Sequence, residues 1–303
     1  MPKRFTGVLA PVVMPYKDDY TPDARLLIKQ CEWLLAQNVG LAVFGTNSEG
    51  NSLSTEEKIN LIDLLVVAGI DPNQMMPGTG CCALSDSIRL TSHAIEAGCG
   101  GVLMLPPFFY KNVTDDGLYG SYSEIIQRVG SSKLRLYLYH IPQVANVPIS
   151  LNLIERLLRD YPNTVVGIKD SSGDWENTKA MLDQKWNNFR VFVGSETFLL
   201  KNMLHGGAGC ISATANVNPE AIYQAFTNWK SENADKVQAE LNKVRDLFVK
   251  YPVIPALKQC VAHFSEQPSW KRLRPPLIEL NEAQTKALIN DLQTINFNMP
   301  GIK

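Results

Sequence analysis

The sequence predicts an α/β protein, a (β/α)8 barrel of the TIM type with a C-terminal helical extension. Eight short apolar runs, each followed by a helical pattern, succeed one another over the first 230 residues, and a closed parallel barrel requires eight such alternations. Only helical patterns follow this region. We therefore expect a barrel domain over residues 1–230 and a helical extension, packed on the barrel, over residues 231–303.

The first four strand–helix pairs are identified by apolar runs and helix-start signals. Thr21-Pro22-Asp23 supplies an N-cap, a proline at the first helical position and an early acid. Ser54 and Glu57 form a capping box. We expect strands at about residues 7–14, 39–45, 75–80 and 101–105, the third being the weakest, with helices at about 21–35, 54–68, 85–97 and 116–129.

The second half of the barrel repeats the pattern. Ser150 is an N-cap residue, and Asn218-Pro219-Glu220 begins the helix after the last strand. We expect strands at about residues 134–141, 165–170, 190–193 and 210–214, with helices starting near 150 and 174, a short helix ending at 206–207, and another helix after 218. In the extension, helices are expected at about residues 234–250, 255–264 and 282–295.

The composition excludes several classes of protein. The chain has 303 residues with a net charge of -1 and no run of like charges, so neither nucleic acid nor an anionic membrane is expected as a partner. Proline and charged residues interrupt every candidate apolar span of about 20 residues. The six cysteines are scattered without zinc-ligand spacing. We expect a soluble cytoplasmic protein with reduced cysteines.

The strongest chemical signal is a lysine at the end of the apolar run 165–168. In a regular strand Val165, Gly167 and Lys169 share one face, and the glycine would leave an empty volume beneath the lysine stem. An ammonium group taken out of water becomes easier to deprotonate, and a neutral amine can attack a carbonyl. The stretch therefore predicts a lysine able to form a Schiff base. Extension of Lys169 into solvent is the alternative.

Two more predicted strands end in polar side chains. Residues 45–50 form a turn that contains Thr46 and Asn47, and its backbone N–H groups and hydroxyls could bind a carboxylate without a metal. A purely structural polar turn is the alternative. Tyr137 and Tyr139 share one face of the fifth predicted strand. The tyrosine nearer the carboxyl end can reach the site and act as a proton shuttle.

Metal and nucleotide chemistry have no support in the sequence. The four histidines are far apart, and only His140 lies at a predicted strand end. No dinucleotide fingerprint, phosphate-binding loop, nucleophile elbow or zinc-protease motif occurs. We expect no metal and no cofactor.

Three motifs then occur in order at the predicted strand ends, namely Gly45-Thr46-x-x-Glu49, Tyr139-x-Ile141-Pro142 and Gly167-Ile168-Lys169-Asp170. With these motifs the chain resembles the dihydrodipicolinate synthase and N-acetylneuraminate lyase family over nearly its whole length. The segment 206–216 also matches the eighth strand of that family. The resemblance favours the chemical interpretation of Lys169 over extension into solvent.

The resemblance implies a TIM barrel with a helical tail, assembled as a homotetramer of two tight dimers. It implies a Schiff base between Lys169 and the keto carbon of pyruvate or a longer 2-oxo acid. Tyr139 would be the proton shuttle, and Thr46 would pass protons and contact the substrate. Asn47 would bind the substrate carboxylate through its backbone N–H, and Ile211 would place a carbonyl near the lysine.

Three departures from the family pattern bear on the substrate. Asn47 stands where the family usually has a second hydroxyl residue. Val144 stands where the lysine-pathway synthase has an arginine that binds the carboxylate of its second substrate, which counts against aspartate semialdehyde. The stretch 107–111 is one residue longer than the synthase pattern, so either Phe109 or Tyr110 would take the place of its interface tyrosine. We predict Tyr110, because only it has a proton to transfer.

The leading hypothesis is a Schiff-base lyase or aldolase that cleaves a 2-oxo acid to pyruvate and an aldehyde, or condenses the two. The lysine-pathway synthase and a dehydratase of a 2-oxo-3-deoxy sugar acid remain alternatives with the same imine. A catalytically silent barrel that binds a small metabolite is the non-enzymatic alternative. The presence of Lys169, Tyr139 and Thr46 together argues against it.

Overall fold

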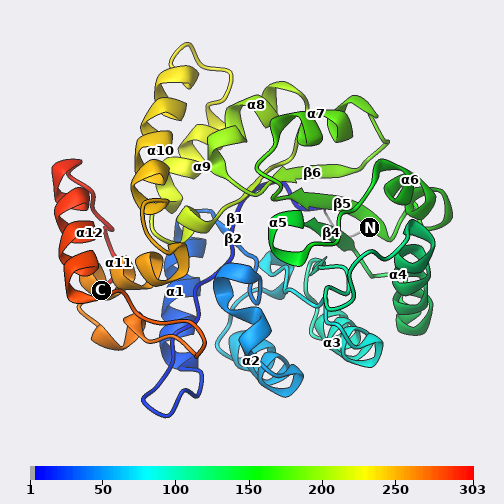
Figure 1. Cartoon of the computed structure of the whole chain (residues 1–303), viewed down its shortest axis with the longest axis horizontal. Helices are drawn as coiled ribbons and strands as arrows, with labels where there is room; N and C mark the ends of the chain where they lie inside the picture. Colours follow the sequence, from blue (N-terminus) through cyan, green and yellow to red (C-terminus); the bar gives the residue numbers. More distant parts are fainter. Residues whose placement is uncertain (1–3) are drawn as a thin grey trace.

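The computed structural model describes residues 4–303, and at its centre a parallel sheet curls into a barrel (Figure 1). The strands lie in the order β2-β1-β7-β6-β5-β4-β3, and all neighbours are parallel. Their bounds are β1 (Gly7–Ala10), β2 (Gly40–Leu41), β3 (Val102–Met104), β4 (Leu136–His140), β5 (Val165–Asp170), β6 (Arg190–Val193) and β7 (Gly209–Ile211). The predicted fold class is confirmed.

The segment 75–80, predicted as the third strand, closes the barrel without forming a continuous strand. Isolated parallel bridges join it to Leu41 of β2 and Leu103 of β3. The N–H of Met76 donates to the carbonyl of Leu41 at 2.7 Å, and the N–H of Thr79 donates to that of Leu103 at 2.9 Å. A proline in the middle of the segment has no N–H to contribute, which breaks the ladder. The prediction of a regular strand here is therefore wrong.

Two other strands are shorter than predicted because the chain turns early. The run 39–45 forms only β2, since Phe44 has a φ of 63° and turns the backbone away from the sheet. The run 210–214 is a strand only to Ile211, after which a short 3-10 helix begins at Ala213. Both turns lie at the carboxyl end of the barrel, where the chain is released from the sheet.

Helices surround the barrel and follow its strands (Figure 1). They are α1 (Ala24–Ala36), α2 (Thr55–Val67), α3 (Leu84–Glu96), α4 (Asp115–Val129), α5 (Pro142–Ala145), α6 (Leu151–Asp160), α7 (Trp175–Asp183), α8 (Leu199–Leu204) and α9 (Pro219–Thr227). The short 3-10 helices are η1 (Thr46–Ser48), η2 (Gly50–Ser52), η3 (Pro72–Gln74), η4 (Glu196–Phe198), η5 (Ala213–Asn216) and η6 (Pro268–Lys271). No helix within residues 4–303 is both long and apolar enough to span a bilayer.

The predicted starts of two helices are confirmed by side chains that cap the backbone. Ser54 and Glu57 form the capping box of α2, and the Ser150 side chain caps α6. The first helix begins later than predicted, because Asp23 is the N-cap and Pro22 pairs with Tyr16 in an isolated bridge. The cap prediction at Thr21 is therefore corrected to Asp23.

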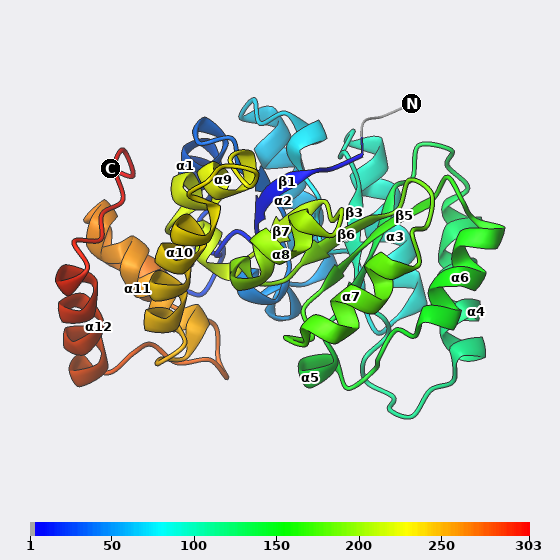
Figure 2. The same cartoon turned by 90° about the horizontal axis from the view of Figure 1, so that it is seen from above.

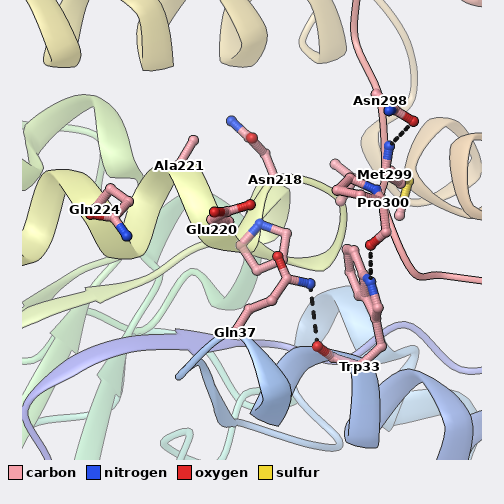
Figure 3. A pocket seen from close by; sticks show the side chains of 11 residues that line it. Trp33, Gln37, Asn218, Glu220, Ala221, Gln224, Asn298, Met299 and Pro300 are labelled. Carbon is pink, nitrogen blue, oxygen red and sulfur yellow. Dashed lines mark hydrogen bonds between the residues drawn. The ribbon is translucent and has the colours of Figure 1, made fainter.

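The remaining helices are α10 (Ala234–Phe248), α11 (Val253–Ser265) and α12 (Glu282–Thr294), as predicted for the end of the chain. They gather on one side of the barrel, beside α1 and α9 (Figures 1 and 2). Helix α10 also contacts η4, which follows β6 at the carboxyl end of the barrel. Close to the end of the chain, the Trp33 indole N–H donates to the Pro300 carbonyl at 2.9 Å (Figure 3). The C-terminal segment therefore reaches both α1 and the functional end of the barrel.

Two apolar clusters lie on the two sides of the sheet. The larger one lies between strands and helices, and the smaller one fills the barrel interior. The interior cluster consists of Leu9, Ala42, Met76, Leu103, Tyr137, Tyr139, Ile141, Ala145, Val166, Phe192, Ala208 and Ile211.

The expectation that Val165 shares a face with Gly167 and Lys169 is wrong. Val165 belongs to the outer cluster and Val166 to the interior, because the β4–β5 register shifts between Leu136 and Tyr137. A register irregularity of this kind locally changes the side to which residues point.

The expected empty volume at Gly167 is also occupied. A Cβ atom there would lie 2.6 Å from Cδ1 of the Tyr137 ring and 2.5 Å from the Arg190 carbonyl oxygen. The glycine therefore makes room for Tyr137, and not for the lysine stem.

Candidate active site

A cavity of about 340 Å³ lies at the carboxyl ends of the barrel strands. Thr46 and Asn47 from η1, Tyr139 from β4 and Lys169 from β5 line it together. These four residues were predicted from three segments that span residues 46–169, and the parallel barrel brings them to one end because all its strands run in the same direction. The cavity is therefore the candidate active site.

Lys169 lies inside the protein. Its side chain is 2% exposed, and its Nζ lies 4.3 Å from the centroid of the Tyr139 ring. The two residues are paired in register across β4 and β5, and Phe192 of β6 pairs with Lys169 on the other side. Extension of the amine into solvent is therefore excluded, and the amine faces an aromatic ring within the cavity.

The hydroxyls of Tyr139 and Thr46 form a hydrogen-bonded pair beside the lysine. Tyr139 Oη and Thr46 Oγ1 are 3.1 Å apart. Tyr137 has no such role, because its hydroxyl accepts from the N–H of Phe5 at 2.8 Å, and burial raises its pKa to about 12. Of these two tyrosines, Tyr139 is therefore the one whose hydroxyl can exchange protons in the cavity.

The turn after β2 is built to carry Thr46 and Asn47. A Cβ on Gly50 would lie 2.0 Å from the Phe44 carbonyl oxygen, so only glycine fits there. The first N–H groups of a helix have no partner within the helix, and Thr46 and Asn47 are the first two residues of η1. These N–H groups can therefore serve an anion in the cavity.

Asp170, which follows Lys169 in the sequence, has a structural role. Its carboxylate accepts from the Thr178 hydroxyl at 2.6 Å, the Asn177 amide at 3.0 Å and the Ser172 N–H at 2.9 Å. These bonds fasten the loop after β5 to α7. The Asp170 carboxylate is therefore already occupied by these three hydrogen bonds.

His140, the histidine at a predicted strand end, is likewise engaged. Its Nδ1 accepts from the N–H of Ile149 at 3.0 Å. Burial lowers its pKa, although the nearby Asp170 acts in the opposite direction. A neutral imidazole with Nδ1 as acceptor fits both facts, and His140 does not line the cavity.

The loops that follow β5 and β6 contribute unequally to the cavity lining. Ser171 and Ser195 line the cavity. Glu196 does not line it, because its buried carboxylate accepts from the hydroxyls of Ser212 and Thr214. The Glu196 carboxylate therefore has a structural role, because it joins the loop after β6 to the segment that follows β7.

Two other predicted site residues lie outside the cavity lining. Ile211 is buried in the barrel interior at the end of β7. Tyr110 is 75% exposed, and its ring packs edge-on against Phe109 with the centroids 5.2 Å apart. Neither residue is among those that line the cavity within this chain. Val144, the apolar substitute for the synthase arginine, does line it.

Sequence reasoning missed the contribution of the C-terminal helices. Arg245 of α10 and Val253 of α11 line the cavity. The helical pattern of residues 234–250 predicts α10 but carries no information on which end of the barrel it covers. Gln143 of α5 was also missed, because the short helix α5 was not predicted.

A second cavity of about 310 Å³ lies between α1, α9 and residues 298–300 (Figure 3). Trp33, Gln37, Glu220 and Gln224 are among its lining residues, and none of the predicted site residues is. In the part of the chain that the structure describes, no group of three or more His, Cys, Asp or Glu side chains is arranged to hold a metal ion.

A parallel barrel that holds a buried lysine, a tyrosine and a threonine in one cavity at the carboxyl ends of its strands is suited to the chemistry of class I lyases, in which a lysine amine forms a Schiff base. The comparisons with known proteins specify the class further. The sequence model of the dihydrodipicolinate synthetase family matches residues 4–295. The chain belongs to this family, and the expected lyase class is confirmed.

Relatives in the family carry more than one name. An uncharacterised DapA-like lyase of Chloroflexus aurantiacus is 32% identical over 93% of this chain and 94% of its own length. A 4-hydroxy-tetrahydrodipicolinate synthase of Methanococcoides burtonii is 30% identical over 96% of this chain and 98% of its own. The crystal structure of dihydrodipicolinate synthase from Agrobacterium tumefaciens is similar with a TM-score of 0.88 and 28% identity, covering 96% of this chain and 99% of that one.

Proposed function

We propose that this protein is a lyase or aldolase that cleaves a 2-oxo acid to pyruvate and an aldehyde, or condenses them, through an imine on Lys169. The observation that carries the proposal is the buried Lys169 amine, 4.3 Å from the Tyr139 ring centroid in a cavity shared with Thr46. The lysine amine is the nucleophile that attacks the keto carbon in Schiff-base catalysis.

The proposed reaction begins with attack of Lys169 Nζ on the keto carbon. Tyr139 delivers a proton to the carbinolamine hydroxyl, which leaves as water, and Thr46 relays protons to Tyr139. The protonated imine then accepts the electron pair of the C3–C4 bond of a 4-hydroxy-2-oxo acid. The 4-hydroxyl proton passes to Tyr139, and the aldehyde departs. Protonation of the enamine at C3 and addition of water release pyruvate and the free amine.

The substrate carboxylate next to the keto group is assigned to the turn after β2. The N–H groups of Thr46 and Asn47 at the start of η1 support this role. The carbonyl of Ile211, at the end of β7, is assigned a place near the lysine by the family resemblance. Synthase activity with aspartate semialdehyde is the second candidate, supported by the name of the Methanococcoides burtonii relative. The presence of Val144 in place of the synthase arginine weakens it.

Trapping of the imine tests the proposal. Native protein, Lys169→Ala and a control variant with an exposed lysine removed, Lys201→Ala, are incubated with pyruvate and borohydride, and intact mass is measured. We expect a pyruvyl adduct on the native protein and on Lys201→Ala, but not on Lys169→Ala. No adduct on native protein at saturating pyruvate would remove the proposed function and favour the silent, metabolite-binding barrel.

We also propose a homotetramer of two tight dimers in the cytoplasm, with residues 1–230 as the barrel domain and 231–303 as the extension. The exposed side chain of Tyr110 supports the dimer, because a partner subunit could receive it at an interface. Light scattering reports the assembly state, and Tyr110→Phe should then lower turnover without preventing the pyruvyl adduct. A monomer with full activity would contradict the proposed assembly.

A further inference from the structure

Arg245 reaches the cavity from the C-terminal extension. It is among the residues that line the cavity with Lys169 and Tyr139. Its Nη1 atom is buried and has no hydrogen-bond partner among residues 4–303. No carboxylate of that part of the chain forms an ion pair with its guanidinium. A buried donor without an acceptor is costly and rare in folded proteins, so the position calls for an external acceptor.

The position of Arg245 is set by a fixed helix face. Seven residues earlier, Gln238 donates from its amide to the Glu196 carbonyl at 2.9 Å and accepts from the Leu200 N–H at 3.0 Å. Residues seven apart lie on the same face of a helix, two turns from each other. The hydrogen bonds of Gln238 thus orient that face of α10 toward the loop after β6. Arg245 lies two turns further along the same face, where it lines the cavity.

The charges in the cavity do not compensate one another. Asp170 is the carboxylate-bearing residue in its lining, and three donors of its own loop and helix already occupy that carboxylate. Lys169 is used in the proposed imine. The guanidinium of Arg245, whose Nη1 has no acceptor among residues 4–303, therefore remains as a positive group suited to a planar carboxylate or a phosphate.

We propose that Arg245 binds a second anionic group of the substrate, at the end remote from the keto acid function. This inference rests on the proposed function and narrows its substrate class. The substrate would be a 2-oxo acid with a terminal carboxylate or phosphate, and cleavage would release pyruvate and an aldehyde that carries the anionic group. A neutral sugar-derived aldehyde would leave Arg245 without an acceptor.

The proposal explains how an anionic aldehyde is recognised although Val144 replaces the arginine of the synthase pattern. Val144 and Arg245 come from separate segments, α5 and α10. A substrate anion bound by Arg245 is contacted from α10, whereas an anion bound by an arginine at position 144 would be contacted from α5. The two arrangements favour aldehydes of different length and shape, so aspartate semialdehyde is not the expected partner.

The test measures condensation of pyruvate with matched aldehydes. Glyoxylate and succinate semialdehyde carry a carboxylate, glyceraldehyde 3-phosphate carries a phosphate, and glycolaldehyde and glyceraldehyde are neutral. Native protein should prefer a charged aldehyde. Arg245→Leu should lose about ten- to hundredfold in kcat/KM for that aldehyde, as expected for one charge-assisted hydrogen-bonding group, with little change for neutral ones. Whether the carboxylates or the phosphate show this loss identifies the anion.

Two further variants keep the test decisive. Arg245→Lys retains the charge without the planar fork and should recover part of the preference. Lys243→Leu removes a cation from an exposed position of the same helix and should change nothing. Equal loss for charged and neutral aldehydes in Arg245→Leu, or no preference of native protein for a charged aldehyde, would overturn the inference.

The borohydride adduct with pyruvate separates this inference from the proposed function. The adduct should form on Arg245→Leu, because the imine needs Lys169 and not the arginine. An adduct on all proteins together with no effect of Arg245 on aldehyde choice would reject only the anion site. No adduct on native protein would reject the imine, and the anion site with it.

Discussion

Lys258 Nζ and Glu49 Oε1 lie 2.5 Å apart, and both side chains are completely buried. Glu49 ends the motif that begins with Gly45-Thr46, while Lys258 lies on α11 in the C-terminal extension. Burial raises the pKa of Glu49 and lowers that of Lys258 to about 8. The ion pair therefore joins the turn that carries Thr46 to the extension.

We predict that Lys258→Met destabilises the fold by about 3–5 kcal/mol, because it leaves the Glu49 carboxylate buried without its partner. Guanidinium chloride unfolding at pH 7 measures the effect. The control is Lys243→Met, which removes an exposed ion pair with Glu240 and should cost less than about 1 kcal/mol. Equal effects of the two substitutions would show that the buried pair does not hold the extension to the barrel.

We expect the ionised Glu57 carboxylate to make the stability of the fold sensitive to acid. Arg274 donates to its carboxylate, one contact being 2.9 Å, and lowers its pKa below the ordinary value. Above the unfolded-state pKa the ionised carboxylate contributes stability. That contribution is lost as the pH falls through the lowered pKa of the folded state, since the unfolded chain then binds more protons.

The variant Glu57→Gln should therefore be less stable at pH 7 and lose less stability on acidification from pH 7 to the acid range below 4. Urea unfolding at a series of pH values provides the comparison. Parallel stability curves for native protein and Glu57→Gln over this range would refute the assignment to this carboxylate.

The Tyr139 hydroxyl is predicted to transfer protons. Tyr139→Phe keeps the ring beside Lys169 but removes the hydroxyl that lies 3.1 Å from Thr46 Oγ1. We expect the rates of imine formation and turnover to fall about 10²–10⁴-fold, the usual contribution of general acid–base catalysis. Rapid-quench trapping with borohydride follows imine formation directly.

Tyr137→Phe is the matched control, because its hydroxyl accepts from Phe5 N–H outside the cavity. This variant should retain the trapping rate and lose about 1 kcal/mol of stability, as for one hydrogen bond. A similar loss of rate in both variants would mean that Tyr139 acts through packing and not through its proton.

Gly167 is predicted to be intolerant of a side chain. In Gly167→Ala the new methyl group would meet both the Tyr137 ring and the Arg190 carbonyl at less than 3 Å. Overpacking of a well-packed interior costs about 1–3 kcal/mol or more. Thermal unfolding and yield of soluble protein report the cost.

Gly120→Ala, within α4, is the opposite case, since an added Cβ would meet no atom within 4 Å other than those of its own stretch of helix. It should stabilise the protein by about 0.5–1 kcal/mol, because alanine favours a helix over glycine. If Gly167→Ala left the thermal stability unchanged, the β4–β5 pair would be able to shift and accommodate the methyl group.

The sequence by itself determined the order of strands and helices, the capping residues of α2 and α6, and the residues at the strand ends. These features depend on neighbours within a few positions along the chain, through backbone periodicity and local hydrogen bonds. Lys169, Tyr139 and Thr46 could be named as candidates for the same reason, because each follows or ends an apolar run.

Only the tertiary structure decided what the remote segments do to one another. The register shift between β4 and β5 reversed the expected direction of Val165, and the Tyr137 ring took the space at Gly167. The position of α10 brought Arg245 to the cavity, and the contact with α11 gave Glu49 its partner. Distances between residues more than 30 positions apart depend on packing of whole elements, which no local pattern encodes.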